Sequence, residues 1–217
     1  MSKEATAGDE QKPRRMRVAV LISGSGRTLQ NFIELSRAGR LPIEIVLVVS
    51  SRADVAGVER GRKAGIPVEV IARRGRSLEE FSRAVTVAVD AARVDLVLMA
   101  GWLCRWQIPP AYENRVMNIH PALLPKHGGQ GFYGHHVHEA VLAAGDAESG
   151  CTVHFANNEY DAGPIILQRR VPVLPGDTAD ALADRVFEQE CIAYPEAIRL
   201  FAEGRLRVER GRVVILK

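Results

Sequence analysis

The sequence predicts an α/β fold with a mostly parallel sheet, and two observations carry this prediction. Continuous apolar runs at residues 17–23, 43–50 and 96–100 are typical of strands that are buried on both faces of a parallel sheet. Segments with apolar residues at helical spacing follow these runs, and such an alternation favours parallel strands covered by helices. We therefore expect one domain over residues 16–217.

The first predicted unit is a strand at 17–23, a glycine-rich turn at 24–28 and a helix that begins after Thr28. This arrangement presents backbone N–H groups and a helix N-terminus to an anion. A dinucleotide fits poorly, because Leu29 replaces the third glycine of the usual pattern and no acidic residue ends the strand at 43–50. A monophosphate fits better, and a tight turn without a ligand is the alternative.

The remaining elements follow from periodicity and turn chemistry. They are a helix at 56–64, a strand at 68–71, a helix opened by a capping box at 77–80, strands at 96–100 and 116–120, a helix at 136–144, strands at 151–155 and 165–171, a helix after Thr178 and a terminal hairpin at 205–216.

Asn118 and His120 carry the strongest chemical signal. They are two residues apart in the predicted strand 116–120, so they point to the same face. Pro121 ends that strand, which places an amide and an imidazole at its carboxyl end, where open α/β sheets bind ligands. Asn can donate to a developing oxyanion, and His can shuttle protons. The alternative is a pair of core residues that are satisfied locally.

Two carboxylates also have unusual predicted positions. Asp161 lies in a polar loop after the strand 151–155, and the alternative to a functional role is a turn aspartate that bonds its own backbone. Glu190 falls on the apolar stripe of the last long helix, where an unpaired charge would be costly. It needs a partner, which is either a ligand or a structural ion pair.

The composition excludes several classes of protein. A net charge of +3 over 217 residues is too small to argue for nucleic acid. The three cysteines, Cys104, Cys151 and Cys191, are far apart and odd in number, which argues against a disulfide framework and fits a reducing cytoplasm. Residues 1–15 are polar, so we expect a disordered leader and no signal peptide. No apolar run approaches the length of a membrane span.

Four motifs, in order and at compatible spacing, make the chain similar to the folate-dependent formyltransferases. They are VLISGSG at 20–26, NIHPALLP at 118–125, GCTVHF at 150–155 and DAGPIILQ at 161–168. Each is weak alone, but the resemblance extends over nearly the whole chain. It implies a Rossmann-like formyltransferase fold, with a twisted sheet and helices on both of its faces.

The resemblance also implies an activity, the transfer of the formyl group of 10-formyltetrahydrofolate to the amine of glycinamide ribonucleotide in purine biosynthesis. It places catalysis on Asn118, His120 and Asp161, and the substrate amine at Glu190. It places the substrate phosphate on Gly24, Ser25, Gly26, Arg27 and Thr28. It places folate on Leu103, Cys104, Arg105, Trp106, Asn118, Asn157, Asn158, Glu159, Tyr160 and Asp161. No metal, nucleic acid or membrane is expected.

The chain departs from the family pattern in four places. Arg27-Thr28 replaces Ser-Asn in the phosphate turn, and Leu78 lies near the position where an Arg often meets the folate tail. The segments 102–108 and 126–135 are longer than usual. The glycine-rich composition of the second segment predicts a mobile loop over the site.

Two other functions stay open. A formyltetrahydrofolate hydrolase usually carries an N-terminal regulatory domain, for which we expect no room before residue 17. An inactive nucleotide-binding module is the alternative from another class, and the intact Asn118, His120 and Asp161 count against it. We expect a monomer or a homodimer.

Overall fold

The computed structural model describes residues 14–217, so most of the predicted leader lies outside the described residues. The strands of the main sheet are β1 (Met16–Ile22), β2 (Ile43–Ser50), β3 (Val68–Val70), β4 (Leu96–Met99), β5 (Val116–His120), β6 (Glu148–Phe155) and β7 (Ile165–Pro172). The helices are α1 (Arg27–Arg37), α2 (Ala56–Lys63), α3 (Leu78–Ala91), α4 (His135–Ala143) and α5 (Ala179–Ala202), with a 3-10 turn at Pro110–Tyr112. The hairpin of β8 (Leu206–Glu209) and β9 (Arg212–Ile215) follows α5.

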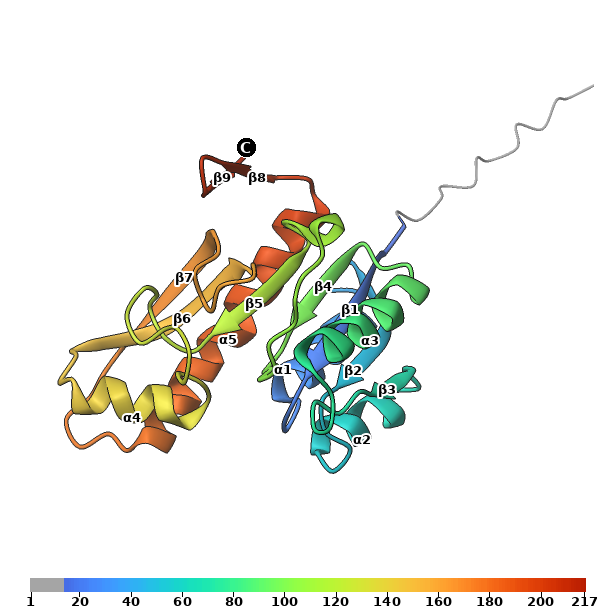
Figure 1. Ribbon diagram of the computed structural model, residues 1–217. Helices are drawn as coiled ribbons and strands as arrows, with labels where there is room; N and C mark the ends of the chain where they lie inside the picture. Colours follow the sequence, from blue (N-terminus) through green and yellow to red (C-terminus); the bar gives the residue numbers. More distant parts are fainter. Residues whose placement is uncertain (1–13) are drawn as a thin grey trace, which may run out of the picture.

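The main sheet has the strand order β3-β2-β1-β4-β5-β6-β7 (Figure 1). The first five strands in this order are parallel, β6 runs antiparallel to β5, and β7 runs antiparallel to β6. The predicted α/β fold with a mostly parallel sheet is therefore confirmed. The order reverses between β1 and β4, which is where open α/β sheets form a ligand crevice at the carboxyl ends of the strands.

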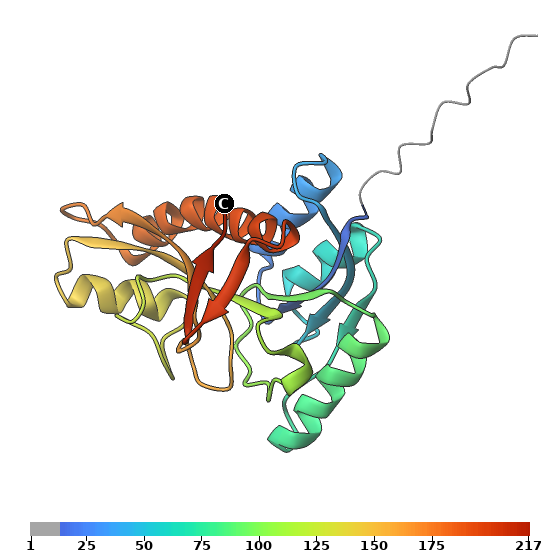
Figure 2. The same cartoon turned by 90° about the horizontal axis from the view of Figure 1, so that it is seen from above.

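Helices cover both faces of the sheet, because the strand residues alternate between two apolar cores. Val18, Val20 and Ile22 of β1 belong to the core that also contains side chains of α1 and α5. Ala19 and Leu21 belong to the core with α3. Figure 2 shows α1 and α5 on one side of the strands and α3 on the other. Strands buried on both faces explain the continuous apolar runs in the sequence.

The long helix α5 is tied to α1 at an internal proline. Pro195 has no backbone N–H, so the carbonyl of Cys191 loses its helical partner. The Asn31 side chain of α1 donates to that carbonyl at 3.2 Å. This bond ties α5 to α1, its neighbour on the same face of the sheet.

The element boundaries differ little from those predicted, with one larger difference at β6. The strand begins at Glu148 and not at Cys151, because Glu148, Ser149 and Gly150 pair with Pro172, Val171 and Arg170 of β7. The capping box that opens α3 is confirmed in both of its hydrogen bonds. No helix within residues 14–217 is long and apolar enough to cross a membrane.

Candidate active site

The candidate site is built on the paired ends of β5 and β6. Asn118 of β5 lies directly opposite His154 of β6, and such cross-strand neighbours interact. The amide nitrogen of Asn118 is 3.1 Å from Nε2 of His154. The Nδ1–H of His154 donates to the Phe155 carbonyl at 3.0 Å, so its Nε2 is available to accept. His154 thereby orients the amide of Asn118 with its N–H groups toward the site.

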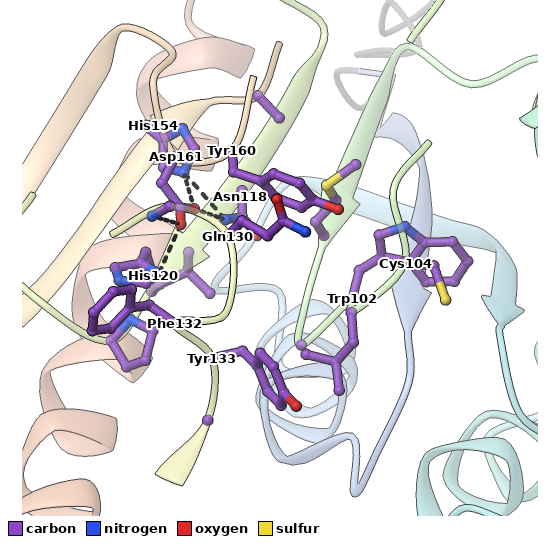
Figure 3. A pocket seen from close by; sticks show the side chains of 18 of the residues that line it. Trp102, Cys104, Asn118, His120, Gln130, Phe132, Tyr133, His154, Tyr160 and Asp161 are labelled. Carbon is purple, nitrogen blue, oxygen red and sulfur yellow. Dashed lines mark hydrogen bonds and ion pairs between the residues drawn. The ribbon is translucent and has the colours of Figure 1, made fainter. Parts of the chain in front are cut away.

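Asp161 connects these side chains (Figure 3). Its Oδ1 lies 3.5 Å from Nδ2 of Asn118 and 3.6 Å from Nε2 of His154. Its Oδ2 lies 3.5 Å from Nδ1 of His120 and accepts from the Gly129 N–H at 3.0 Å. Asn118, His120 and Asp161, which the sequence predicted as a group, therefore lie together in the fold. The imidazole of His154 lies beside them.

The carboxylate of Asp161 is held in its ionised form. Burial alone would raise the pKa of Asp161, but the neighbouring imidazoles of His154 and His120 and the Gly129 N–H together lower it. The backbone of Asp161 has a φ of 52°, a left-handed conformation that Asp adopts more readily than most residues. The site thus contains a fixed negative charge beside two imidazoles.

His120 is more fully engaged than the sequence suggested. Its Nε2 lies 2.7 Å from the carbonyl oxygen of His127, while its Nδ1 faces Asp161. Burial lowers the pKa of His120 and outweighs the opposing effects of Asp161 and the His127 carbonyl. The buried ring is neutral at neutral pH, because desolvation disfavours its charged form.

The turn after His120 is held by two polar side chains beneath it. The Thr152 hydroxyl donates to the Ala122 carbonyl at 2.7 Å and accepts from the Leu124 N–H at 3.0 Å. The Gln168 amide donates to the Leu124 carbonyl at 2.9 Å. Thr152 is paired with His120 across β5 and β6, so these bonds fix the chain immediately after the imidazole.

A cavity of about 710 Å³ lies at the carboxyl ends of the strands, and its size suits a small-molecule ligand. Asn118, His120, His154 and Asp161 line it. All the sequence-predicted folate residues line it as well, namely Leu103, Cys104, Arg105, Trp106, Asn157, Asn158, Glu159 and Tyr160. In Figure 3, Trp102 and Cys104 lie across the cavity from His120 and Asp161.

Only part of the predicted phosphate turn lines the cavity. Arg27 and Thr28 line the cavity, whereas Gly24, Ser25 and Gly26 form the turn beneath without lining it. A side chain at position 26 would lie 2.7 Å from the Cα of Gly57, and the φ of Gly26 is 69°. Gly26 is therefore required for the close approach of the turn to α2. Arg27 lies 3.0 Å from Asp184 and stacks on the Phe187 ring, both on α5.

Glu190 lies in the same cavity, partly buried on α5. Within residues 14–217 it has no oppositely charged side-chain atom within 4.0 Å, since Arg27 pairs with Asp184 instead. Burial raises the pKa of Glu190 to about 7, against a smaller opposing effect of Arg27. The structural ion pair considered from the sequence is therefore wrong, and Glu190 has the position and the unmet charge of a ligand-binding group.

Two of the predicted folate residues also hold the surrounding loops together. The Asn158 side chain accepts from the Ile108 N–H at 2.8 Å and donates to the Ile108 carbonyl at 3.1 Å. The Trp106 ring is 3% exposed, and its N–H donates to the Thr86 hydroxyl at 3.1 Å. Both side chains therefore join the loop after β4 to its neighbours. Their polar groups are used in these bonds, so only their other atoms can contact a ligand.

Sequence reasoning missed several cavity residues. His154 could have been considered, because it is a polar residue two positions after Thr152 in a predicted strand. Its pairing with Asn118, however, depends on a strand register that the sequence does not reveal. Others come from the glycine-rich segment and the start of α4, among them Gly129, Gln130, Phe132, Tyr133 and His138, and further ones from the loop after β4 and from α5, among them Trp102, Asp180, Ala183 and Phe187. Burial lowers the pKa of His138 to about 4, so this imidazole is neutral.

Among residues 14–217, no group of three or more His, Cys, Asp or Glu side chains is arranged to hold a metal ion. The site offers instead an amide donor, a neutral imidazole and an ionised carboxylate at the paired ends of β5 and β6. These groups define an α/β enzyme equipped to support a developing oxyanion and to move a proton.

The chain belongs to the formyl transferase family, whose model matches residues 16–198. A phosphoribosylglycinamide formyltransferase of Haemophilus influenzae is 38% identical over 196 residues, which are 89% of this chain and 90% of that protein. The crystal structure of glycinamide ribonucleotide transformylase 1 from Symbiobacterium toebii matches with a TM-score of 0.90 at 41% identity, covering 98% of this chain and all of that one.

A longer relative shows the same similarity over part of its length. The trifunctional purine biosynthetic protein adenosine-3 of Drosophila pseudoobscura is 44% identical over 198 residues. These residues are 89% of this chain but only 14% of that protein. The family resemblance read from the four motifs is confirmed.

Proposed function

We propose that the chain transfers the formyl group of 10-formyltetrahydrofolate to the amine of glycinamide ribonucleotide, the phosphoribosylglycinamide formyltransferase reaction of purine biosynthesis. The observation that carries this proposal is one cavity shared by Asn118, His120 and Asp161, by Thr28 and Glu190, and by the predicted folate loops. The cavity reaches from the turn that is predicted to bind phosphate to the two loops that are predicted to bind folate, so the proposed positions of the two substrates meet at this polar group.

The reaction needs a hydrogen-bond donor for the oxyanion that forms and an acceptor for the proton of the amine. The substrate amine attacks the formyl carbon, and the formyl oxygen becomes negative. Asn118 donates to this oxygen and gives up its long contact with Asp161, at 3.5 Å, for a shorter hydrogen bond to the oxyanion. Neutral His120 takes the amine proton, directly or through water, at Nδ1. The imidazolium that forms is stabilised by Asp161 and by proximity to the oxyanion. The oxyanion then collapses to the new formamide as the bond between the formyl carbon and N10 of the folate breaks, and the imidazolium returns its proton to N10, so that neutral tetrahydrofolate leaves.

Thr28 is the side chain of the turn that we expect to meet the substrate phosphate, since it lines the cavity at the start of α1. Thr28→Val keeps the shape and removes the hydroxyl. A hydrogen bond to a charged group contributes about 1.5–3 kcal/mol, so the KM for the nucleotide should rise roughly tenfold or more. The KM for the folate is the internal control. A rise confined to the folate KM would refute the assignment. Gly26→Val would be a poorer test, because it would also disturb Gly57.

Glu190→Gln should weaken nucleotide binding and also change the pH dependence of stability. The folded-state pKa of about 7 lies above the ordinary value of 4.5, so stability is lost as pH rises through 7. Gln lacks this titration. Each pKa unit corresponds to about 1.4 kcal/mol, and each kcal/mol to about 2–4 °C in a chain of this size. The Tm of the variant should therefore exceed that of the wild type by several degrees at pH 8 and by much less at pH 5. A Tm lowered at both pH values would contradict the position assigned to Glu190.

The activity itself is tested by following tetrahydrofolate release by absorbance, with and without glycinamide ribonucleotide. Release should require the nucleotide. Release at the same rate without it would favour the hydrolase, and no release under either condition would favour an inactive binding module. The relatives compared above carry the name of the transferase, which supports transfer over hydrolysis.

We also infer a cytoplasmic location, supported by three cysteines that are all free in the structure. The absence of a metal, of nucleic acid and of a membrane from the reaction stays a prediction. The same holds for a monomer or homodimer as the state in solution.

A further inference from the structure

The glycine-rich segment contributes two backbone groups to the catalytic centre. The His127 carbonyl lies 2.7 Å from Nε2 of His120, and the Gly129 N–H donates to Asp161 at 3.0 Å. Both distances are shorter than the 3.5 Å between His120 and Asp161 themselves. Gly128 lies between them and packs closely, since a Cβ there would be 3.4 Å from that of Asp161 and 2.4 Å from Leu124.

The carbonyl of His127 determines which nitrogen of His120 carries the proton. A carbonyl oxygen can only accept, so Nε2 must be the protonated nitrogen in the neutral ring. Nδ1 then has a free lone pair beside Asp161. A proton taken from the substrate amine is received at Nδ1, where the carboxylate stabilises it. The opposite tautomer would have no lone pair on that side.

The backbone of His127 is held in an unusual conformation by a surface clamp. Its φ is 52°, in the left-handed region that a non-glycine residue occupies at a cost. Its side-chain Nε2 lies 2.8 Å from Oδ2 of Asp146, and the Lys126 ammonium lies 2.8 Å from Oδ1. These contacts lower the pKa of Asp146, in the order Lys126 and then His127. The Asp146 carboxylate is therefore charged and bound to two consecutive residues of the segment.

We propose that Asp146 is a positioning residue for catalysis. By clamping Lys126 and His127, it holds the His127 carbonyl against His120 and so keeps His120 in the tautomer whose Nδ1 accepts the substrate proton. Asp146 lies in the turn between α4 and β6 and is not among the cavity residues. The inference rests on the proposed role of His120.

Asp146→Ala and His127→Gly test the proposal, since the second removes the imidazole while allowing a left-handed backbone. A misplacement of about 1 Å at a reacting group can cost on the order of 100-fold, so kcat should fall roughly ten- to a hundredfold in both variants. The KM values should change little. Glu148→Gln is the control, because Glu148 pairs with Arg170 on the surface at 2.6 Å without touching the segment.

The pH profile gives a readout that a general loss of structure would not produce. His120 faces Asp161, His154, His127 and His138, and of its two close polar contacts, with the His127 carbonyl and with Asp161, we expect the variants to release only the carbonyl. That carbonyl raises the pKa of His120, so its loss lowers the pKa further. The acid limb of kcat should therefore move to lower pH in both variants and stay in place in Glu148→Gln.

The tautomer is measured directly by NMR of the enzyme labelled with ¹⁵N-histidine, with His120→Asn used for assignment. The wild type should carry its proton on Nε2, and Asp146→Ala should show a share of the Nδ1–H form. Protonation at Nδ1 in the wild type would overturn the proposal, as would variants with unchanged tautomer, kcat and pH profile. Normal turnover by His120→Asn would instead refute the proposed role of His120, while the tautomer measurement would stand.

Discussion

Asp161→Asn should lower kcat by about 10²–10⁴-fold, the range of a general acid–base contribution, while the KM values change much less. Asn keeps the size of the side chain but removes the charge that stabilises the imidazolium of His120 at 3.5 Å. It also weakens the acceptor that faces Asn118 and the Gly129 N–H. Steady-state kinetics with both substrates varied measures the effect.

A double mutant separates a coupled group from independent contributions. If His120 and Asp161 act as one unit, His120→Ala/Asp161→Asn should be little worse than the poorer single variant. Fully multiplicative losses would contradict the coupling. The single variant has a second readout, since the loss of Asp161 should lower the pKa of His120 and move the acid limb of the profile to lower pH.

Gly163→Ala should disable the enzyme without touching a reacting atom. A Cβ at this position would lie 1.7 Å from the Phe155 carbonyl oxygen and 2.9 Å from its carbon. Both are backbone atoms at the end of β6, so the loop that carries Asp161 must move. A shift of about 1 Å in the carboxylate can cost on the order of 100-fold in rate, and overpacking typically costs about 1–3 kcal/mol of stability. We expect kcat to fall by about that factor and Tm to fall by several degrees.

The neighbouring Ala162→Ser is the matched control, because Ala162 is exposed in the same turn. It should leave both kcat and Tm near those of the wild type. A folded Gly163→Ala enzyme with near-normal turnover would show that Asp161 does not depend on the close approach of this loop to β6.

The sequence by itself determined the elements and the family. Apolar runs mark strands buried on two faces, and the capping box at Ser77 starts α3 where expected. Asn118 and His120 could be placed on one face of a strand because a strand repeats every two residues. These are local properties, set by neighbours along the chain, and they were therefore open to prediction.

Only the tertiary structure decided which groups touch. The pairing of Asn118 with His154 depends on the register of β5 against β6. A shift of one residue would place Val153 or Phe155 opposite Asn118 instead. Only the structure shows that Glu190 lacks a charged partner, because Arg27 pairs with Asp184 instead. The neutral state of His120 depends on burial, which lowers its pKa by more than the neighbouring Asp161 carboxylate raises it. Contact and desolvation depend on segments far apart in sequence, so no local pattern could have fixed them.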